Sequence, residues 1–304
     1  MNKNIQQFLN LYDVRPYKEI NINSKGKLKY FLDKHSTKEG AWARLDLHDG
    51  EIDFIFQNGE SKEITRHTVV SNSNKLMIPP ASWHKIEPKS PDFNATLTFY
   101  CKTHRYVEKK YHLPKIHSDL LYVYQNYLVN QENLNILDVG CGKGRNTIYF
   151  SLLNNQVTGI DINESSINYI NEIVQKENLS RFQIIKHDLN TPLNLNQKTY
   201  DFIYSTVTLQ FLNESRITSL LTELQKATTH LGMHFLVFPI KEDLYTYPDS
   251  FTYLAKINEL YEFYQDSGWA VLEYNETVGH LHKTDKTGKP MQGLFGQLLA
   301  QKID

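Results

Sequence analysis

Three glycines, Gly140, Gly142 and Gly144, directly follow an apolar run that ends at Val139. Glycine adopts positive φ at little cost and has no side chain, so such a loop can bring bare backbone N–H groups against a ligand. A dinucleotide fingerprint needs another glycine at the sixth position, which here is Arg145. A phosphate-binding P-loop is excluded as well, because no Gly-Lys-Ser/Thr closes the segment. The spacing therefore predicts a cradle for a different ligand.

The G-x-G-x-G spacing is similar to the loop of class I S-adenosylmethionine methyltransferases, which holds the methionine portion of that cofactor. Asp161 ends the next apolar run about twenty residues further on, where a carboxylate can accept hydrogen bonds from both ribose hydroxyls. Asp188 follows the third run and is expected near the adenine amino group, with Leu189 as the apolar neighbour of the ring. The motif at 200–205 comes last, and its end is expected to face the sulfonium. In this order, the elements predict an S-adenosylmethionine site.

These residues must be positioned by strands and helices, which alternate from about residue 105 to the end of the sequence. We expect strands at 135–139, 156–161, 182–187, 200–205 and 233–238, and helices at 120–129, 146–153, 165–177 and 215–228. Strands separated by helices favour a parallel, doubly wound, Rossmann-like α/β sheet with both faces covered. Ligands bind at the carboxyl ends of such strands, so the predicted site residues share one edge of the sheet.

The region before residue 105 has an all-β pattern. Short alternating runs rich in β-branched and aromatic residues extend from Tyr17 to Cys101. The clearest strands are at 42–47, 52–56 and 95–100, and Asp49-Gly50 predicts a two-residue hairpin between the first two. We therefore expect a small all-β sandwich or barrel domain at residues 1–104, followed by the α/β domain at residues 105–304.

Composition excludes several broad classes of protein. The 33 basic residues nearly balance the 34 acidic ones, so no overall field favours nucleic acid or an anionic membrane. Cys101 and Cys141 are the only cysteines, too few for a disulfide framework. The sequence starts without the pattern of a signal peptide and has no run of about eighteen apolar residues. We expect a cytoplasmic protein that binds neither nucleic acid nor membrane, with homo-oligomerisation left open.

Four segments of the α/β region carry a more specific resemblance. They are Lys110-Tyr111-His112-Leu113 with His117-Ser118, the stretch from Leu137 to Asn146, Tyr200-Asp201-Phe202-Ile203 with Ser205-Thr206-Val207, and the stretch from Tyr274 to His282. Together they resemble the tellurite-resistance methyltransferases of the TehB family. The amino-terminal region resembles the extra β domain of longer family members through residues 37–43, 83–88 and 99–101. The resemblance covers nearly the whole chain.

The resemblance implies methyl transfer from S-adenosylmethionine to tellurite and selenium oxyanions, with S-adenosylhomocysteine as the other product. The expected cofactor contacts are His117, Asp138, Gly140, Gly142, Arg145, Asn146, Asp161, Ile162, Asp188, Leu189, Ser205 and Val207. In the family a His followed by an Arg faces the cofactor, and here that pair is His282 and Lys283. We expect these two residues to be catalytic. A second family arginine falls at or beside Pro290, next to Lys289, and is missing here.

The departures from the family pattern leave other functions open. Lysine lacks the bidentate fork of arginine, so a different small nucleophile, such as a thiol, an amine or a carboxylate, is an alternative substrate. Another alternative is a non-catalytic sensor that binds S-adenosylmethionine. His280 and His282 alternate as on a strand, but two ligands without an obvious third do not make a zinc site, so no metal is expected. His117 is as compatible with capping the first helix as with contacting the cofactor.

Overall fold

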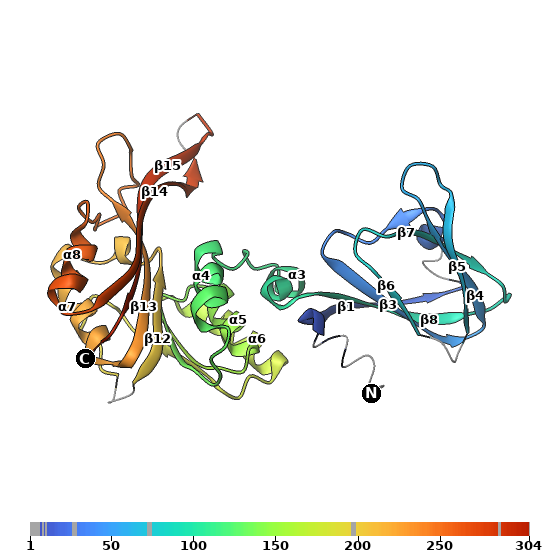
Figure 1. Ribbon diagram of the computed structural model, residues 1–304, viewed down its shortest axis with the longest axis horizontal. Coiled ribbons are helices and arrows are strands. Elements are labelled where there is room, and N and C mark those ends of the chain that lie inside the picture. Colours follow the sequence, from blue (N-terminus) through green and yellow to red (C-terminus); the bar gives the residue numbers. More distant parts are fainter. Residues whose placement is uncertain are drawn as a thin grey trace. The chain divides into compact units, whose positions relative to one another are not determined.

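The chain divides into two compact units in the computed structural model, residues 1–114 and residues 115–304 (Figure 1). The structure describes residues 7, 9, 11–25, 29–71, 75–195, 199–284 and 287–303. The domain boundary predicted after residue 104 stays a prediction. The short helix α3 (Tyr106–Tyr111) follows that boundary in the sequence but packs against β1 (Val14–Asn23) and β8 (Asn94–Lys102) of the first unit. No helix in the described part of the chain is long and apolar enough to cross a membrane.

The first unit is an all-β sandwich, as the sequence predicts. Among its described residues, one antiparallel sheet has the order β1-β8-β3-β6 and the other the order β2-β7-β4-β5. The further elements are α2 (Lys29–Leu32), β2 (His35–Ser36), β3 (Ala41–Asp49), β4 (Glu51–Gln57), β5 (Ile64–Ser71), β6 (Lys75–Ile78), β7 (Trp83–Pro88) and the 3₁₀ turn η1 (Thr103–Arg105). Inward side chains of both sheets, among them Ile22, Leu45 and Phe54, are fully buried in the core between them.

The hairpin predicted at Asp49-Gly50 is wrong. β3 pairs with β6 and β8, whereas β4 pairs with β5 and β7, so the chain crosses from one sheet to the other at Gly50. Gly50 has φ +81°, and a Cβ there would lie 2.5 Å from the backbone oxygen of Asp92. The dipeptide serves a tight corner of the sandwich, where positive φ and close backbone approach are needed just as in a hairpin turn.

The second unit is the predicted doubly wound α/β sheet. Its described strands have the order β11-β10-β9-β12-β13-β15-β14. They are β9 (Asn135–Val139), β10 (Gln156–Asp161), β11 (Phe182–Lys186), β12 (Tyr200–Thr206), β13 (Thr228–Ile240), β14 (Ala270–Thr284) and β15 (Pro290–Gln301). Strands β9 to β13 are parallel, but β15 is antiparallel to both neighbours, which corrects the expectation of a wholly parallel sheet. Only five residues separate β14 from β15, too few for the crossover that a parallel pair requires.

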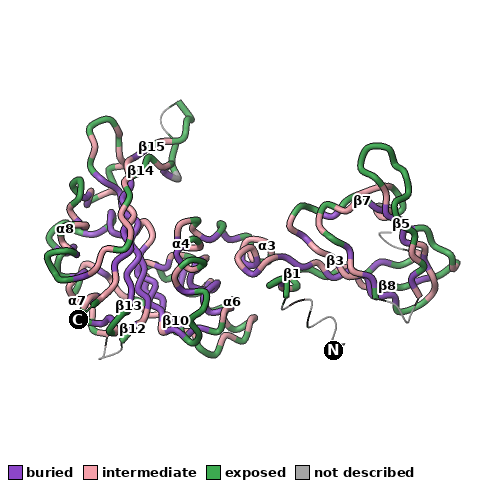
Figure 2. The backbone as a smooth tube through the Cα atoms, viewed as in Figure 1, coloured by how far each residue is buried: buried purple, intermediate pink, exposed green. Residues whose placement is uncertain are grey.

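Helices cover both faces of this sheet. They are α4 (Ser118–Val123) with the π-helical turn η2 (Tyr124–Leu128), α5 (Arg145–Leu152), α6 (Glu164–Glu177), the 3₁₀ turn η3 (Leu209–Phe211), α7 (Glu214–Lys226) and α8 (Glu259–Asp266). Figure 1 shows α4, α5 and α6 on one face and α7 and α8 on the other. One apolar cluster includes Phe150 and Tyr204 and another includes Leu220 and Phe238, and Figure 2 shows the central strands as buried.

The hairpin of β14 and β15 extends beyond the carboxyl end of β13. Ile240, the last residue of β13, pairs with Leu294 of β15, which pairs in turn with Val278 of β14. Residues 279–284 therefore project past the edge at which the parallel strands β9 and β12 also end (Figure 1). This is the edge at which the sequence predicts a binding site.

Candidate functional site

The glycine loop is bonded to the end of the neighbouring strand. The amides of Gly140 and Cys141 both donate to the carbonyl oxygen of Ile160 in β10, at 2.9 Å each. Gly140, Gly142 and Gly144 have positive φ values of +81°, +54° and +82°. Since this left-handed backbone favours glycine, the path of the loop itself accounts for all three residues.

The space available for a side chain differs among the three glycines of the loop. A Cβ on Gly140 would lie 2.2 Å from the side chain of Thr208, and a Cβ on Gly144 would lie 2.8 Å from that of Ile170. A Cβ on Gly142 would meet nothing within 4 Å. The two ends of the loop are therefore packed against the fold, whereas its middle faces open space, as a ligand cradle requires.

Asp161 ends β10 beside the loop, and both of its carboxylate oxygens are fixed. Its Oδ2 accepts a 2.7 Å hydrogen bond from the amide of Gly142, and its Oδ1 accepts a 2.8 Å bond from the amide of Asn163. Asn163 caps α6 through its own side chain. Each carboxylate oxygen retains a second lone pair, so Asp161 can still accept from a ligand hydroxyl. Ile162, the next residue, is 59% exposed.

Asp138 is buried beneath the loop. Its Oδ2 accepts hydrogen bonds from the hydroxyl of Thr147 in α5, at 2.6 Å, and from the hydroxyl of Tyr204 in β12, at 2.8 Å. Burial raises the pKa of the Asp138 carboxyl to about 7, and the two hydroxyl bonds offset only part of that effect. The carboxyl group thus connects β9, α5 and β12 from inside the fold.

Asn146 connects three segments around the loop. Its Oδ1 accepts from the amide of His117 at 3.1 Å, and its Nδ2 donates to the hydroxyl of Thr206 at 3.2 Å. The guanidinium of Arg145 donates to the carbonyl of Lys115 at 3.2 Å. These bonds hold the segment before α4 against the start of α5. His117 occupies the N-cap position of α4, but its side chain makes no capping hydrogen bond.

The carboxyl end of β12 lies against the same loop. Ser205 is fully buried and donates its hydroxyl to the carbonyl of Val139 at 2.9 Å. Val207 has φ +60°, which is rare for a β-branched residue. The side-chain amide of Gln210 donates to the carbonyl of Val207 at 2.6 Å. The end of β12 is therefore bonded to β9 and carries a strained residue where the sequence predicts the sulfonium.

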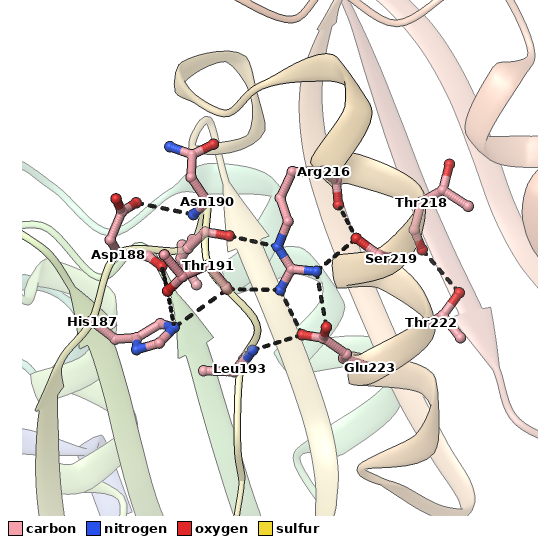
Figure 3. A network of polar contacts seen from close by, with 11 residues as sticks. His187, Asp188, Asn190, Thr191, Leu193, Arg216, Thr218, Ser219, Thr222 and Glu223 are labelled. Atoms are coloured by element: carbon pink, nitrogen blue, oxygen red, sulfur yellow. Dashed lines mark hydrogen bonds and ion pairs between the residues drawn. The ribbon is translucent and has the colours of Figure 1, made fainter.

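The loop after β11 carries Asp188 and Leu189. Asp188 accepts from the amide of Asn190 at 2.9 Å, and Leu189 is 6% exposed. Arg216 of α7 donates to the carbonyl of Leu189 at 2.9 Å, within the polar network drawn in Figure 3. Sequence reasoning missed Arg216. A signal was available, because this arginine continues the apolar stripe of α7, where a charged residue is buried only when it is paired.

Lys283 is exposed on the part of β14 that projects past the sheet. Its Nζ lies 3.5 Å from the hydroxyl oxygen of Ser250. The lysine lines a surface hollow of about 510 Å³, which is also bordered by Leu281, Thr284 and Pro290. His282 precedes it in β14, but the side chain of His282 lies outside the described residues. No group of three or more His, Cys, Asp or Glu residues that could hold a metal ion occurs in the described part of the chain.

Two family models match the chain. Residues 99–299 match the family described as "Tellurite resistance protein TehB". Residues 25–97 match a family described as "TehB-like domain". The two matches follow one another along the sequence and together span most of it.

Relatives and a solved structure match over a similar length. A Haemophilus influenzae (strain 10810) protein named "Probable S-adenosyl-L-methionine-dependent methyltransferase TehB" is 38% identical over 287 residues, covering 94% of this chain and 97% of the relative. "Hemagglutinin 1" of Eikenella corrodens is 30% identical over 239 residues, covering 79% of this chain and 77% of that protein. The crystal structure of TehB from Haemophilus influenzae matches with a TM-score of 0.83 and 34% identity, covering 95% of this chain and 99% of that one.

Proposed function

Since this chain belongs to the tellurite resistance protein TehB family, we propose that it methylates tellurite and selenium oxyanions. The family predicted from the motifs is confirmed over nearly the whole chain. The protein is an S-adenosylmethionine-dependent methyltransferase of the Rossmann-like class I fold that acts on a small molecule. The proposal concerns the identity of that molecule.

The described residues fit the cofactor. Open space in front of Gly142 suits the methionine portion, and the fixed carboxylate of Asp161 suits the two ribose hydroxyls. The exposed side chain of Ile162 offers an apolar surface beside that carboxylate. We assign Asp188 and Leu189 to the adenine base, and the end of β12 to the sulfonium.

One observation carries the substrate assignment. Lys283 lines a hollow on the hairpin that projects past the carboxyl ends of the parallel strands, and its cation lies 3.5 Å from the hydroxyl oxygen of Ser250. An ammonium group and a hydroxyl are suitable partners for the oxygens of a small anion. We assign His282 to the substrate site on the family resemblance alone, in which a His followed by a basic residue faces the cofactor.

The proposed methyl transfer to an oxyanion needs little acid–base catalysis from the protein. When bound, S-adenosylmethionine supplies an electrophilic methyl group and leaves as S-adenosylhomocysteine, whose sulfur keeps the electron pair of the broken carbon–sulfur bond. Tellurium or selenium forms the new bond to carbon with a lone pair, and no proton leaves the attacking atom. The chain therefore has to hold the anion in line with the methyl group and to exclude water, which alignment and charge can achieve without a strong general base.

The test is a transfer assay with methyl-labelled S-adenosylmethionine and either tellurite or selenite. We expect a labelled methylated oxyanion, separated from S-adenosylmethionine by chromatography, from the parent protein and almost none from Asp161→Ala, which lacks the proposed ribose carboxylate. If neither oxyanion is methylated while a small thiol or amine is, the substrate assignment is wrong.

A small organic nucleophile is the second candidate, and a ring cluster next to Ser250 favours it. The rings of Phe211 and Phe251 lie 5.5 Å apart, and those of Tyr247 and Phe251 lie 6.3 Å apart. Phe211 is 52% exposed, so the cluster offers an apolar surface that an oxyanion does not need. Competition between tellurite and a panel of thiols, amines and carboxylates separates the two candidates.

A further inference from the structure

A buried arginine on α7 has every N–H donor engaged. Only 7% of Arg216 is exposed to solvent, and its side chain lies beside the loop that follows β11 (Figure 3). Its Nε donates to the carbonyl of Leu189 at 2.9 Å and one Nη2 hydrogen to the carbonyl of Thr191 at 3.0 Å. The other three hydrogens go to Ser219 at 2.7 Å and to the two carboxylate oxygens of Glu223 at 2.9 and 2.5 Å. A guanidinium has five such hydrogens, so this one is fully satisfied.

Glu223 also binds the backbone of the loop after β11. Its Oε2 accepts a 2.9 Å hydrogen bond from the amide of Leu193, in addition to the bond from Arg216. Burial alone would raise the pKa of Glu223, but the hydrogen bonds from Arg216 and from the Leu193 amide lower it below the usual value. The carboxylate therefore stays ionised at neutral pH. Together the two side chains bind backbone groups of residues 189, 191 and 193, one on every second residue.

The loop at residues 188–193 depends on these hydrogen bonds from Arg216 and Glu223, because it follows the edge strand of the sheet. β11 pairs only with β10 among the described strands, so no strand supports the other side of the loop. A further bond comes from the same direction, since Asn190 accepts from the backbone amide of Asn213, just before α7. The position of residues 188–193 relative to the glycine loop is thus set largely by α7.

We propose that Arg216, supported by Glu223, is a positioning residue that presents Asp188 and Leu189 to the adenine base of S-adenosylmethionine. This inference rests on the proposed adenine role of those two loop residues. Arg216 does not touch the cofactor; it fixes the carbonyl of Leu189 directly and the adjoining residue Asp188 through the loop. The planar fork is essential to this task, because a lysine ammonium in its place cannot serve two carbonyls and a carboxylate in fixed directions.

The experiment compares binding of S-adenosylmethionine with binding of its analogue in which oxygen replaces the adenine amino group. Calorimetric titration needs no methyl acceptor, so a wrong substrate assignment leaves this test intact. The parent should prefer the adenine form, because Asp188 accepts from its amino group. We expect Arg216→Lys and Glu223→Gln to weaken binding of the adenine form about tenfold and the oxygen analogue much less, so that the preference shrinks.

Two further variants make the result specific. Arg181→Gln is the matched control, because Arg181 bonds a carbonyl, that of Asn154, at 3.0 Å near the opposite end of β11. It should lower thermal stability without changing the ratio of the two dissociation constants. Asp188→Ala should abolish the preference.

The outcomes separate the inference from its premise. A parent-like ratio in both Arg216→Lys and Glu223→Gln, with the preference abolished in Asp188→Ala, overturns the role of Arg216. A parent-like ratio in Asp188→Ala overturns the adenine assignment on which that role depends. If Arg216→Lys does not fold, the conservative Glu223→Gln variant alone decides, since it removes one acceptor and leaves the guanidinium in place.

Discussion

The side-chain amide of Gln210 donates a 2.6 Å hydrogen bond to the carbonyl oxygen of Val207, whose φ is +60°. A non-glycine residue in the left-handed region is strained by about 1–2 kcal/mol. Gln210 is 2% exposed, and its own backbone carbonyl accepts from the amide of Thr252 at 2.7 Å. One residue therefore stabilises the strained end of β12 and bonds it to the segment that carries Ser250.

Gln210→Ala is expected to lower the free energy of unfolding by about 1–2 kcal/mol, because it leaves the partly buried carbonyl of Val207 without its donor. Val207→Gly removes the steric cost of positive φ, so Gln210→Ala should cost less in that background. Chemical denaturation of the parent, both single variants and the double variant measures the coupling. Strictly additive effects would show that Gln210 does not serve the strained residue.

Asp161→Asn is expected to weaken S-adenosylmethionine binding by about ten- to a hundredfold. An amide presents an N–H₂ group where one carboxylate oxygen now accepts, so either the Gly142 or the Asn163 amide loses its acceptor. Calorimetric titration measures the dissociation constant. Asp266→Asn, at the exposed end of α8, is the control and should bind like the parent; equal weakening in both variants would contradict a local role for Asp161.

His234 is a buried neutral histidine in the second unit. Its Nε2 lies 2.7 Å from the hydroxyl of Thr228 and its Nδ1 lies 2.6 Å from the hydroxyl of Tyr264. Because Thr228 donates its hydrogen to the carbonyl of Leu224, Nε2 of the histidine carries the proton and Nδ1 accepts from Tyr264. Burial lowers the pKa of His234 to about 3. A second proton would have no acceptor inside this arrangement.

Stability should therefore fall in acid. The unfolded chain takes up a proton at His234 near the ordinary pKa of 6.5, whereas the folded protein does so only near 3, so stability is lost as the pH falls from 6.5 towards 3. The loss for this one group is at most about 1.4 kcal/mol per pH unit. His234→Gln keeps one donor and one acceptor without a titrating proton, and denaturation between about pH 7.5 and 5 should give it a shallower slope than the parent. Identical slopes would exclude His234 as the source.

Much of the site could be predicted from sequence because its residues lie at the ends of consecutive strands. Gly142 and Asp161 are nineteen residues apart but meet at 2.7 Å, since β9 and β10 are parallel neighbours and end at one edge. Order and spacing are sufficient to predict such a meeting. The roles of these residues with cofactor and substrate stay predictions.

Other features of the fold and the site could not be predicted, because they depend on tertiary packing that the spacing of residues does not encode. Arg216 reaches the carbonyls of Leu189 and Thr191 only because α7 packs beside the loop after β11, a contact between segments about twenty-five residues apart. The Asp49-Gly50 pair predicts a hairpin wrongly, because a sandwich corner and a hairpin demand the same backbone freedom. In both cases the local residues were compatible with more than one tertiary arrangement.

The proposed substrate role of Lys283 makes a charge-specific prediction. Lys283→Met should lower kcat/KM for tellurite by about ten- to a hundredfold, because the cation facing the anion is removed. Lys283→Arg should keep or raise it, since a guanidinium can bind two oxygens of one anion. Lys226→Met, at the exposed end of α7, is the control and should behave like the parent.

Ionic strength gives an independent measure of the same charge. Lys283 is exposed, so salt should screen its attraction for the anion and raise KM in the parent and in Lys283→Arg. In Lys283→Met this part of the salt dependence should disappear while S-adenosylmethionine binding is unchanged. Steady-state kinetics at several salt concentrations test this directly. A salt response in Lys283→Met equal to that of the parent would assign the anion to another cation and remove Lys283 from the substrate site.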